Sequence, residues 1–292
     1  MKKIFCVCAV VLLLILVLPT AARAQVDTGR FAFRLYGGLN YLGGGDLNKS
    51  LEGWSGVYGY AWSLIGFSTA DEFKNAGLGM NFGGDFVFQF NPSLGVGLGV
   101  GYLQASSTSE LTYTHVLPAV PDIVETYEVR ASAIPIKASF YYFLPSSGPV
   151  GVNVHAGAGY YLAMAYARYH FALLSDWSQN VYDNLPGGGI GFHGGLGLEF
   201  KLSPMVGIFA EAQGRYAAFA NFEGDEVYTD SFGTSITNTG EAWTLDVSGS
   251  GRTFTISVID ATQPSGSGIS NVHPTKVDFS GFSLVVGLVI RL

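Results

Sequence analysis

Residues 78–90 read LGMNFGGDFVFQF, and the character of the side chains alternates along this stretch. Large apolar residues occupy most even positions, whereas Asn81, Asp85 and Gln89 fall on odd positions. A period of two predicts a β-strand that has one apolar face and one polar or small face.

The same alternation recurs in seven further segments. They are residues 31–41, 94–102, 134–142, 150–164, 190–202, 206–215 and 282–292. Several are longer than the ~9–11 residues that a strand needs to cross a bilayer obliquely. Lipid offers the backbone no hydrogen bonds, so only a closed sheet can present such an apolar face to it. We therefore predict an all-β fold: a transmembrane, antiparallel up-and-down β-barrel of eight strands.

The connections between these segments alternate in length. Turn-forming residues make the short ones at 91–93, 145–149 and 203–204. The long ones cover residues 43–76, 106–126, 168–188 and 223–277. This order is typical of outer-membrane barrels, which have long extracellular loops and short periplasmic turns. An even number of strands then places both ends of the barrel in the periplasm.

The N-terminus predicts the compartment. Lys2 and Lys3 precede an apolar run from Ile4 to Leu18, and Ala22-Arg23-Ala24 fits the small-x-small cleavage rule. We predict a signal peptide at residues 1–24 that is cleaved before Gln25, and a barrel domain at residues 25–292. The protein is expected to be a secreted precursor that becomes an integral outer-membrane protein of a Gram-negative bacterium.

Charge and cysteine content exclude other classes. Both cysteines, Cys6 and Cys8, lie in the leader, so the mature chain has no disulfide. Removal of the three basic residues of the leader from the 15 in the chain leaves 12 against 22 acidic ones, a formal net charge of −10. Nucleic acid requires clustered Lys and Arg, so we predict no nucleic-acid partner.

The last strand resembles a known assembly signal. Gly287-x-x-Ile290-x-Leu292 is similar to the terminal signal by which outer-membrane barrels are recognised for assembly, although that signal usually ends in Phe. Five tyrosines near strand ends fit interfacial girdles: Tyr41, Tyr102, Tyr142, Tyr160 and Tyr216. Over residues 30–292 the chain resembles the OmpA/OmpX-like small outer-membrane β-barrels. The resemblance implies contacts with outer-membrane lipids, lipopolysaccharide and the barrel assembly machinery. We expect no peptidoglycan-tethering role, because no periplasmic domain follows the barrel.

Charged residues are predicted on the interior face of the barrel. They are Arg34, Asp85, Lys137, His155, Glu199, Glu211 and Arg215. One interpretation is a structural network that plugs the lumen, because eight strands leave an interior just wide enough for side chains. The other is a gated narrow pore, since inward glycines at 95, 97, 99, 101, 157, 159, 195 and 197 leave space. In either case we expect Arg34, Asp85, Lys137 and Glu211 to pair.

Two loops have features of their own. Residues 54–67 are rich in aromatics and are expected to be partly stranded. Residues 243–258 predict a hairpin around Ser248–Gly251, which would extend the wall, display a binding surface or add two strands to make a ten-stranded barrel. Residues 223–276 carry seven acidic and two basic side chains. We interpret them as solvated loop charge, with divalent cations bridging lipopolysaccharide as the alternative.

No catalytic, metal-binding or cofactor-binding residue is predicted. His115, His170 and His273 lie in or beside the outer loops, but the chain contains no Gly-x-Ser-x-Gly or His-Glu-x-x-His motif. The leading hypothesis is a non-enzymatic barrel with a structural or surface-interaction role, in which the loops could bind an extracellular ligand. A narrow porin-like channel is the alternative, and a lipid-modifying enzyme comes third.

Overall fold

The structure is a computed structural model, and it describes residues 31–117, 119–145, 148–173 and 177–292. The expected signal peptide and its cleavage site lie outside the described residues. Among the described residues, no helix is both long enough and apolar enough to cross a membrane.

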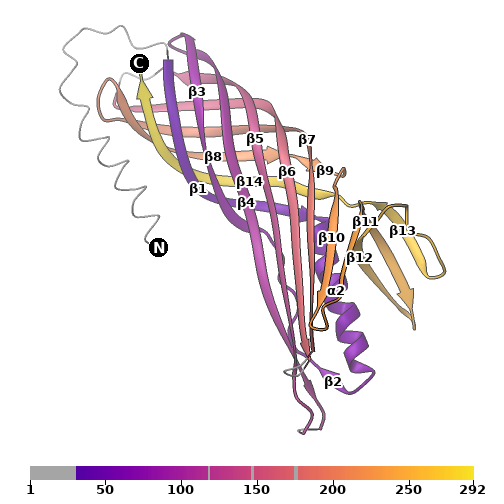
Figure 1. The fold of residues 1–292 in the computed structure, drawn as a ribbon. Helices are drawn as coiled ribbons and strands as arrows, with labels where there is room; N and C mark the ends of the chain where they lie inside the picture. Colours follow the sequence, from indigo (N-terminus) through magenta and orange to yellow (C-terminus); the bar gives the residue numbers. More distant parts are fainter. Residues whose placement is uncertain (1–30, 118, 146–147, 174–176) are drawn as a thin grey trace.

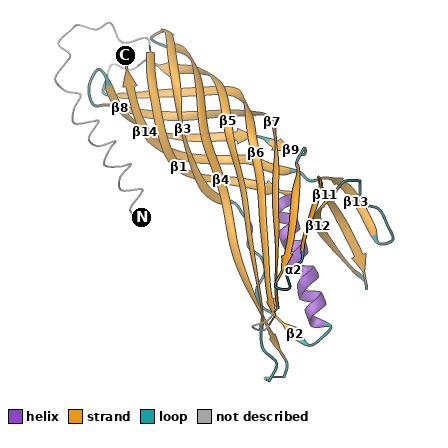
Figure 2. Ribbon diagram, viewed as in Figure 1, coloured by secondary structure: helices purple, strands orange, loops and turns teal. Residues whose placement is uncertain are grey.

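Eight antiparallel strands form a closed ring (Figures 1 and 2). They are β1 (Phe31–Gly45), β3 (Leu78–Asn91), β4 (Leu94–His115), β5 (Ile123–Leu144), β6 (Val150–Leu173), β7 (Trp177–Lys201), β8 (Val206–Tyr216) and β14 (Val277–Arg291). Neighbours in the chain pair from β3 to β8, β1 pairs with both β3 and β14, and β14 pairs with β8. The predicted eight-stranded up-and-down barrel is confirmed.

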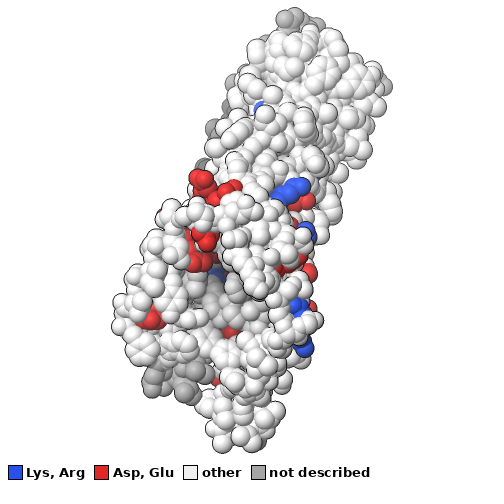
Figure 3. All heavy atoms as spheres, turned by 90° about the vertical axis from the view of Figure 1, so that its right-hand side faces the viewer, with Lys and Arg blue, Asp and Glu red and all other residues white. Residues whose placement is uncertain are grey.

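The outer face of the ring carries an apolar belt. Side chains such as Leu98 and Ile190 are 68% and 71% exposed, and the five predicted girdle tyrosines also point outward. Figure 3 shows almost no charged side chains over the barrel half of this face, whereas acidic and basic groups gather on the other half. This distribution fits a barrel half surrounded by lipid and an outer half surrounded by water.

Four strands continue far beyond this belt, so the loops predicted at 106–126 and 168–188 are wrong in extent. β4 runs to His115 and β5 begins at Ile123, and β6 and β7 are extended in the same way. Beyond the belt the period of two persists with its polarity reversed. On β4, Glu110 and Thr112 face outward, while Leu111 and Tyr113 are buried. Above the membrane the outer face of the strands is in water, so polar residues are expected on that face. The polar residues that suggested loops therefore belong to strands.

The last long connection folds into a sheet that is attached to this extension. It contains β10 (Glu223–Asp230), β11 (Ser235–Gly249), β12 (Arg252–Asp260) and β13 (Ile269–Pro274), and it is preceded by the short β9 (Ala218–Phe219). β10 pairs with the outer part of β7, β11 pairs with β10, and β12 pairs with β11. The predicted hairpin is therefore confirmed, with Ser250 and Gly251 forming its turn at positive φ. The ten-stranded alternative is wrong, because this sheet extends the wall instead of joining the ring.

The first long connection contains α2 (Asp46–Ser63), so the strand expected within 54–67 is wrong except at β2 (Phe67–Ser68). Trp54, Tyr58 and Trp62 are spaced by four residues and pack from one face of the helix against the inner face of the extended wall. A spacing of four satisfies a period of two as well as a helical period, which explains the error. The two apolar surfaces bury each other above the barrel.

Candidate functional site

The middle of the lumen contains two buried ion pairs. Arg34 Nη2 of β1 lies 2.6 Å from Glu211 Oε2 of β8. Lys137 Nζ of β5 lies 3.3 Å from Asp85 Oδ1 of β3. The structure therefore pairs the four residues for which the sequence predicted pairing.

Neutral polar groups complete this network. Lys137 Nζ donates a hydrogen bond to Tyr36 Oη at 2.8 Å, and Tyr141 Oη donates one to Asp85 Oδ2 at 3.2 Å. The guanidinium of Arg34 also stacks 4.1 Å from the centre of the Phe209 ring. Buried charges with this many partners hold one arrangement of the surrounding strands. Tyr36 and Tyr141 were not among the predicted site residues, although the alternation places both on the interior face. Tyr36 shares its face of β1 with Arg34, and Tyr141 shares its face of β5 with Lys137.

The other three predicted lumen residues have different partners. Glu199 forms an ion pair with Arg291. Arg215 Nη2 donates to Asn40 Oδ1 at 2.5 Å, and its Nε donates to a backbone carbonyl of β14. His155 Nδ1 lies 3.7 Å from Glu211 Oε1, and this nitrogen has no hydrogen-bond partner among the described residues. All seven residues thus lie inside the barrel: His155 lies beside Glu211 of the first ion pair, whereas Glu199 and Arg215 belong to separate groups.

Neighbouring side chains fill the space beside several of the inward glycines. A Cβ at Gly97 would lie 2.7 Å from the ring of Tyr141, and one at Gly195 would lie 2.6 Å from His155 Cε1. A Cβ at Gly99 would overlap the carboxylate of Asp85. These three glycines make room for a larger side chain on the next strand, so the space that the sequence left open beside them is occupied.

The lumen is closed in layers. A cavity of about 20 Å³ remains in the polar layer, which is room for about one water molecule. The apolar groups on one side of it are Ala32, Tyr36, Val87, Tyr141, Phe209, Val285 and Val289. On the other side, towards the extracellular half, are fourteen buried side chains that include Leu42, Leu103, Tyr161, Phe219, Phe222 and Phe279.

A serine and a histidine also meet in the lumen. Ser139 Oγ and His193 Nε2 are 2.8 Å apart. Nδ1 of His193 is buried and has no hydrogen-bond partner in the described part of the chain. The carboxylate that orients the histidine in a catalytic triad is therefore missing from this pair.

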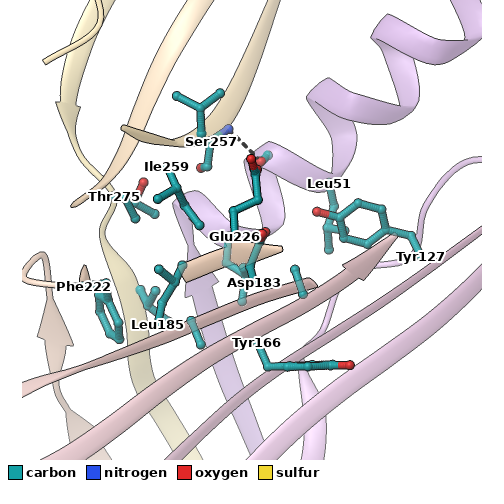
Figure 4. A pocket seen from close by; sticks show the side chains of 17 residues that line it. Leu51, Tyr127, Tyr166, Asp183, Leu185, Phe222, Glu226, Ser257, Ile259 and Thr275 are labelled. Atoms are coloured by element: carbon teal, nitrogen blue, oxygen red, sulfur yellow. Dashed lines mark hydrogen bonds between the residues drawn. The ribbon is translucent and has the colours of Figure 1, made fainter. Parts of the chain in front are cut away.

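A second site lies above the barrel, and we call it the outer cleft. It is bounded by α2, by the inner face of β5–β7 and by β10–β12, and its volume is about 50 Å³. Figure 4 shows Asp183 and Glu226 in the middle of the cleft, with Leu51 of α2 on one side and Ile259 of β12 on the other. A hydrogen bond from the backbone of Ser257 to Ser50 Oγ, 2.8 Å long, joins the helix to the sheet at the edge of the cleft.

The two acids of the outer cleft are direct cross-strand neighbours. Asp183 on β7 pairs in register with Glu226 on β10. Oδ1 of Asp183 is buried without a hydrogen-bond partner among the described residues, whereas Glu226 Oε1 accepts a bond of 2.9 Å from Asn238. Burial, and then the charge of Glu226, raise the pKa of Asp183 to about 7. Residues 168–188 were expected to form a loop, so Asp183 was not among the predicted site residues.

Another acid, Glu125, is fully buried and joins α2 to the wall. Glu125 Oε1 accepts hydrogen bonds from Trp62 Nε1 at 2.7 Å and from Tyr169 Oη at 3.0 Å. Burial raises the pKa of Glu125, which favours its protonated form. This contact holds the C-terminal half of the helix in place.

The histidines and acids of the outer loops have local partners. His115, His170 and His273 contact Ile65 O, Asn180 and Asp46. Asp225, Asp230, Asp246 and Asp260 accept hydrogen bonds from nearby hydroxyl, amide or backbone groups. Within the described ranges, no three His, Cys, Asp or Glu side chains gather as metal ligands.

A closed ring of antiparallel strands, with an apolar outer belt and a filled interior, defines an integral outer-membrane barrel. The chain belongs to the outer membrane protein beta-barrel domain family, whose model matches residues 10–239. Among solved structures it is similar to the crystal structure of the outer membrane protein OprG from Pseudomonas aeruginosa, with 11% identity and a TM-score of 0.36. That alignment covers 91% of this chain and 96% of the other. A search of curated proteins gives no match.

Proposed function

We propose that this protein is a non-enzymatic outer-membrane barrel with a closed lumen, which presents a folded extracellular lobe for a structural or surface-interaction role. The observation that carries the proposal is the layered filling of the lumen. One apolar cluster surrounds the ion pairs of Arg34 and Lys137 and a second lies beyond it, and the cavity between the two clusters has room for about one water molecule. A passive solute would have to displace both clusters.

The size and order of the lobe support a role for the loops. Closing two neighbouring strands needs only a few residues. Here the connection from β8 to β14 contains four strands of its own, and the connection from β1 to β3 contains the 18-residue helix α2. These elements enclose the outer cleft, which a simple structural cap would not need.

A narrow porin-like channel is the second candidate. It is supported by the position of the small cavity, which is lined by Lys137, His155 and Arg215. A rearrangement of those side chains would be needed to connect the cavity to both ends of the barrel. A lipid-modifying activity has less support, because Ser139 and His193 lie inside the barrel without a carboxylate partner.

The biogenesis of the protein is part of the same proposal. A signal peptide at residues 1–24 would direct a secreted precursor to the outer membrane of a Gram-negative cell. The barrel assembly machinery would then recognise Gly287 and Ile290 on β14 and Leu292 directly after it. Lipids and lipopolysaccharide would surround the apolar belt.

The test is the conductance of the refolded mature chain, residues 25–292, in a planar lipid bilayer. A heat-dependent shift in gel mobility confirms folding beforehand, and protease protection in vesicles confirms insertion. We expect no discrete conductance steps. Reproducible steps would overturn the closed lumen, above all if Asp85→Asn or Lys137→Gln changed the ion selectivity.

A further inference from the structure

The outer cleft contains two carboxyl groups that have no cationic partner among the described residues. Asp183 and Glu226 face each other across β7 and β10, and neither forms an ion pair within the described part of the chain. Like charges directly opposite each other on neighbouring strands destabilise a sheet. A buried carboxylate oxygen without a partner, such as Oδ1 of Asp183, adds a further cost.

Four basic residues of the lobe are engaged elsewhere. Lys49 pairs with Asp46, and Arg130 pairs with Glu128. Arg168 stacks on Tyr182, and Arg252 stacks on Tyr60. The described side chains that line the cleft include no Lys, Arg or His, so when both acids are ionised a balancing cation has to come from outside the chain.

The rest of the lining is apolar with a few hydroxyl groups. Leu51, Ala165, Leu185 and Ile259 supply aliphatic surface around the two carboxylates. Such a surface suits methylene groups and gives little to a hydrated metal ion, which needs six or more oxygen ligands if it is Ca²⁺ or Mg²⁺. The ligand class that fits both parts of the lining is an ammonium group on an unbranched alkyl chain.

The size of the cleft limits the ligand further. An apolar cavity of about 150 Å³ holds a benzene molecule. The outer cleft measures about 50 Å³, so it encloses an ammonium nitrogen and the first carbons of its chain. A quaternary ammonium with four alkyl groups exceeds this volume.

We propose that the outer cleft binds the primary ammonium group of an unbranched alkylamine, with Asp183 and Glu226 as its two charge partners. The ammonium hydrogens bond to both carboxylates, and the adjacent methylenes contact Leu51 and Ile259. The amine is either a free alkylamine or the side chain of a lysine on another protein, since the terminal groups are the same. This inference rests on the proposed surface-interaction role and gives that role a ligand class.

The test is titration calorimetry of the refolded mature chain in detergent micelles at pH 8, where Asp183 is ionised. The probes are n-propylammonium chloride, the neutral 1-propanol, tetraethylammonium chloride and a short acetylated peptide with one lysine. We expect saturable binding of n-propylammonium with one site per chain, and no binding of 1-propanol or tetraethylammonium. If the peptide binds as well, the amine can come from a lysine side chain of another protein. If n-propylammonium binds and the peptide does not, the ligand is a free alkylamine.

The variants separate the site from general effects of charge. Asp183→Asn and Glu226→Gln should each weaken n-propylammonium binding by about tenfold or more, because each removes a charged hydrogen-bond partner. Asp225→Asn is the matched control, since Asp225 is the exposed neighbour of Glu226 on β10, and its binding should equal that of the wild type. The heat-dependent gel shift verifies folding of every variant.

Absence of saturable binding to a folded protein would overturn the proposal, as would undiminished binding to both Asp183→Asn and Glu226→Gln. Equal binding of 1-propanol would also overturn it, because the site would then be only apolar. Conductance reports separately on the lumen. A protein that is silent in the bilayer but does not bind amines contradicts this inference alone, whereas a protein that conducts contradicts the closed barrel.

Discussion

Arg34 and Glu211 illustrate what single residues do inside this barrel. The two residues are 177 positions apart in the sequence, and both side chains are almost completely buried. Arg34 Nη2 lies 2.6 Å from Glu211 Oε2. A buried ion pair adds little net stability, since desolvation offsets the attraction, but the loss of one partner leaves an uncompensated charge. The pair therefore acts mainly by excluding other arrangements of β1 and β8.

We expect Glu211→Ala to lower the free energy of unfolding by about 3–5 kcal/mol, because Arg34 then remains buried without its partner. Urea unfolding in lipid vesicles, followed by tryptophan fluorescence, measures the change. The double variant Arg34→Met with Glu211→Leu should recover most of the loss. Glu223→Ala, at an exposed position of the lobe, should stay within about 0.5 kcal/mol of the wild type.

Asp183 predicts a pH dependence of stability. Its pKa is about 7 in the folded protein, against 3.8 for an ordinary aspartate, so the folded state holds its proton more tightly than the unfolded state. The contribution of Asp183 to the free energy of unfolding is therefore complete below about pH 4, and it is lost as the pH rises towards 7. Glu226, Tyr127 and Tyr166 are the other titratable groups of the cleft, and burial raises the pKa of Tyr127 well above its ordinary value.

We therefore expect the stability of Asp183→Asn relative to the wild type to rise between pH 4 and pH 7 and to be constant above that range. Unfolding midpoints in urea from pH 4 to pH 8, without added amine, give the curve. Asp225→Asn should run parallel to the wild type over the whole range. A parallel curve for Asp183→Asn as well would show that burial does not shift the proton affinity of Asp183.

Among the elements, α2 depends on contacts with two surfaces at once. Its aromatic face packs on the extended wall, where the ring of Trp62 stacks on Phe171 with centroids 5.4 Å apart. Gly53 and Gly56 lie against β12, where a Cβ at Gly53 would overlap the carbonyl of Thr255. The absence of side chains at these glycines brings the helix backbone into direct contact with the edge strand.

We expect Gly53→Ala to separate α2 from β12 and to lower stability by about 1–3 kcal/mol, which is the usual effect of overpacking. Limited proteolysis of the folded protein in vesicles should show faster cleavage within residues 46–66. Gly59→Ala is the matched control on the same helix, because no atom lies within 4 Å of the added methyl group. It should resist cleavage as well as the wild type and gain up to about 1 kcal/mol from helix propensity. Equal cleavage of both variants would contradict the role given to Gly53.

Across the whole molecule, the outer face of a single strand changes its surroundings from lipid to water. Leu98 and Thr112 both point outward from β4, the first within the apolar belt and the second beyond it. The boundary between them follows from the exposed side chains of all eight strands. It divides the molecule into a lipid-facing barrel and an aqueous lobe (Figure 3).

We expect Leu98→Arg to destabilise the barrel by about 2–4 kcal/mol, the cost of a charge in the middle of the bilayer. Thr112→Arg on the same face of the same strand should change stability by less than about 0.5 kcal/mol. Unfolding in vesicles measures both variants. A large loss for Thr112→Arg would place the lipid boundary farther out along β4.

The sequence by itself determined the eight strands, the antiparallel barrel and the inward direction of the seven charged residues. The alternation of apolar and polar residues is a local property of the chain. Because lipid offers no hydrogen bonds to the backbone, only a closed sheet can present such an apolar face to it. The sequence did not show α2, because Trp54, Tyr58 and Trp62 fit both a strand and a helix, nor the extensions of β4–β7, where water reverses the polarity of the faces.

Only the tertiary structure decided which charges meet. Arg34 pairs with Glu211, and Asp183 faces Glu226, through strand register and barrel closure. These depend on contacts between residues far apart in the chain, which no local pattern records. The outer cleft arises for the same reason, since it forms where a helix, the extended wall and the sheet that continues this wall come together from distant parts of the sequence.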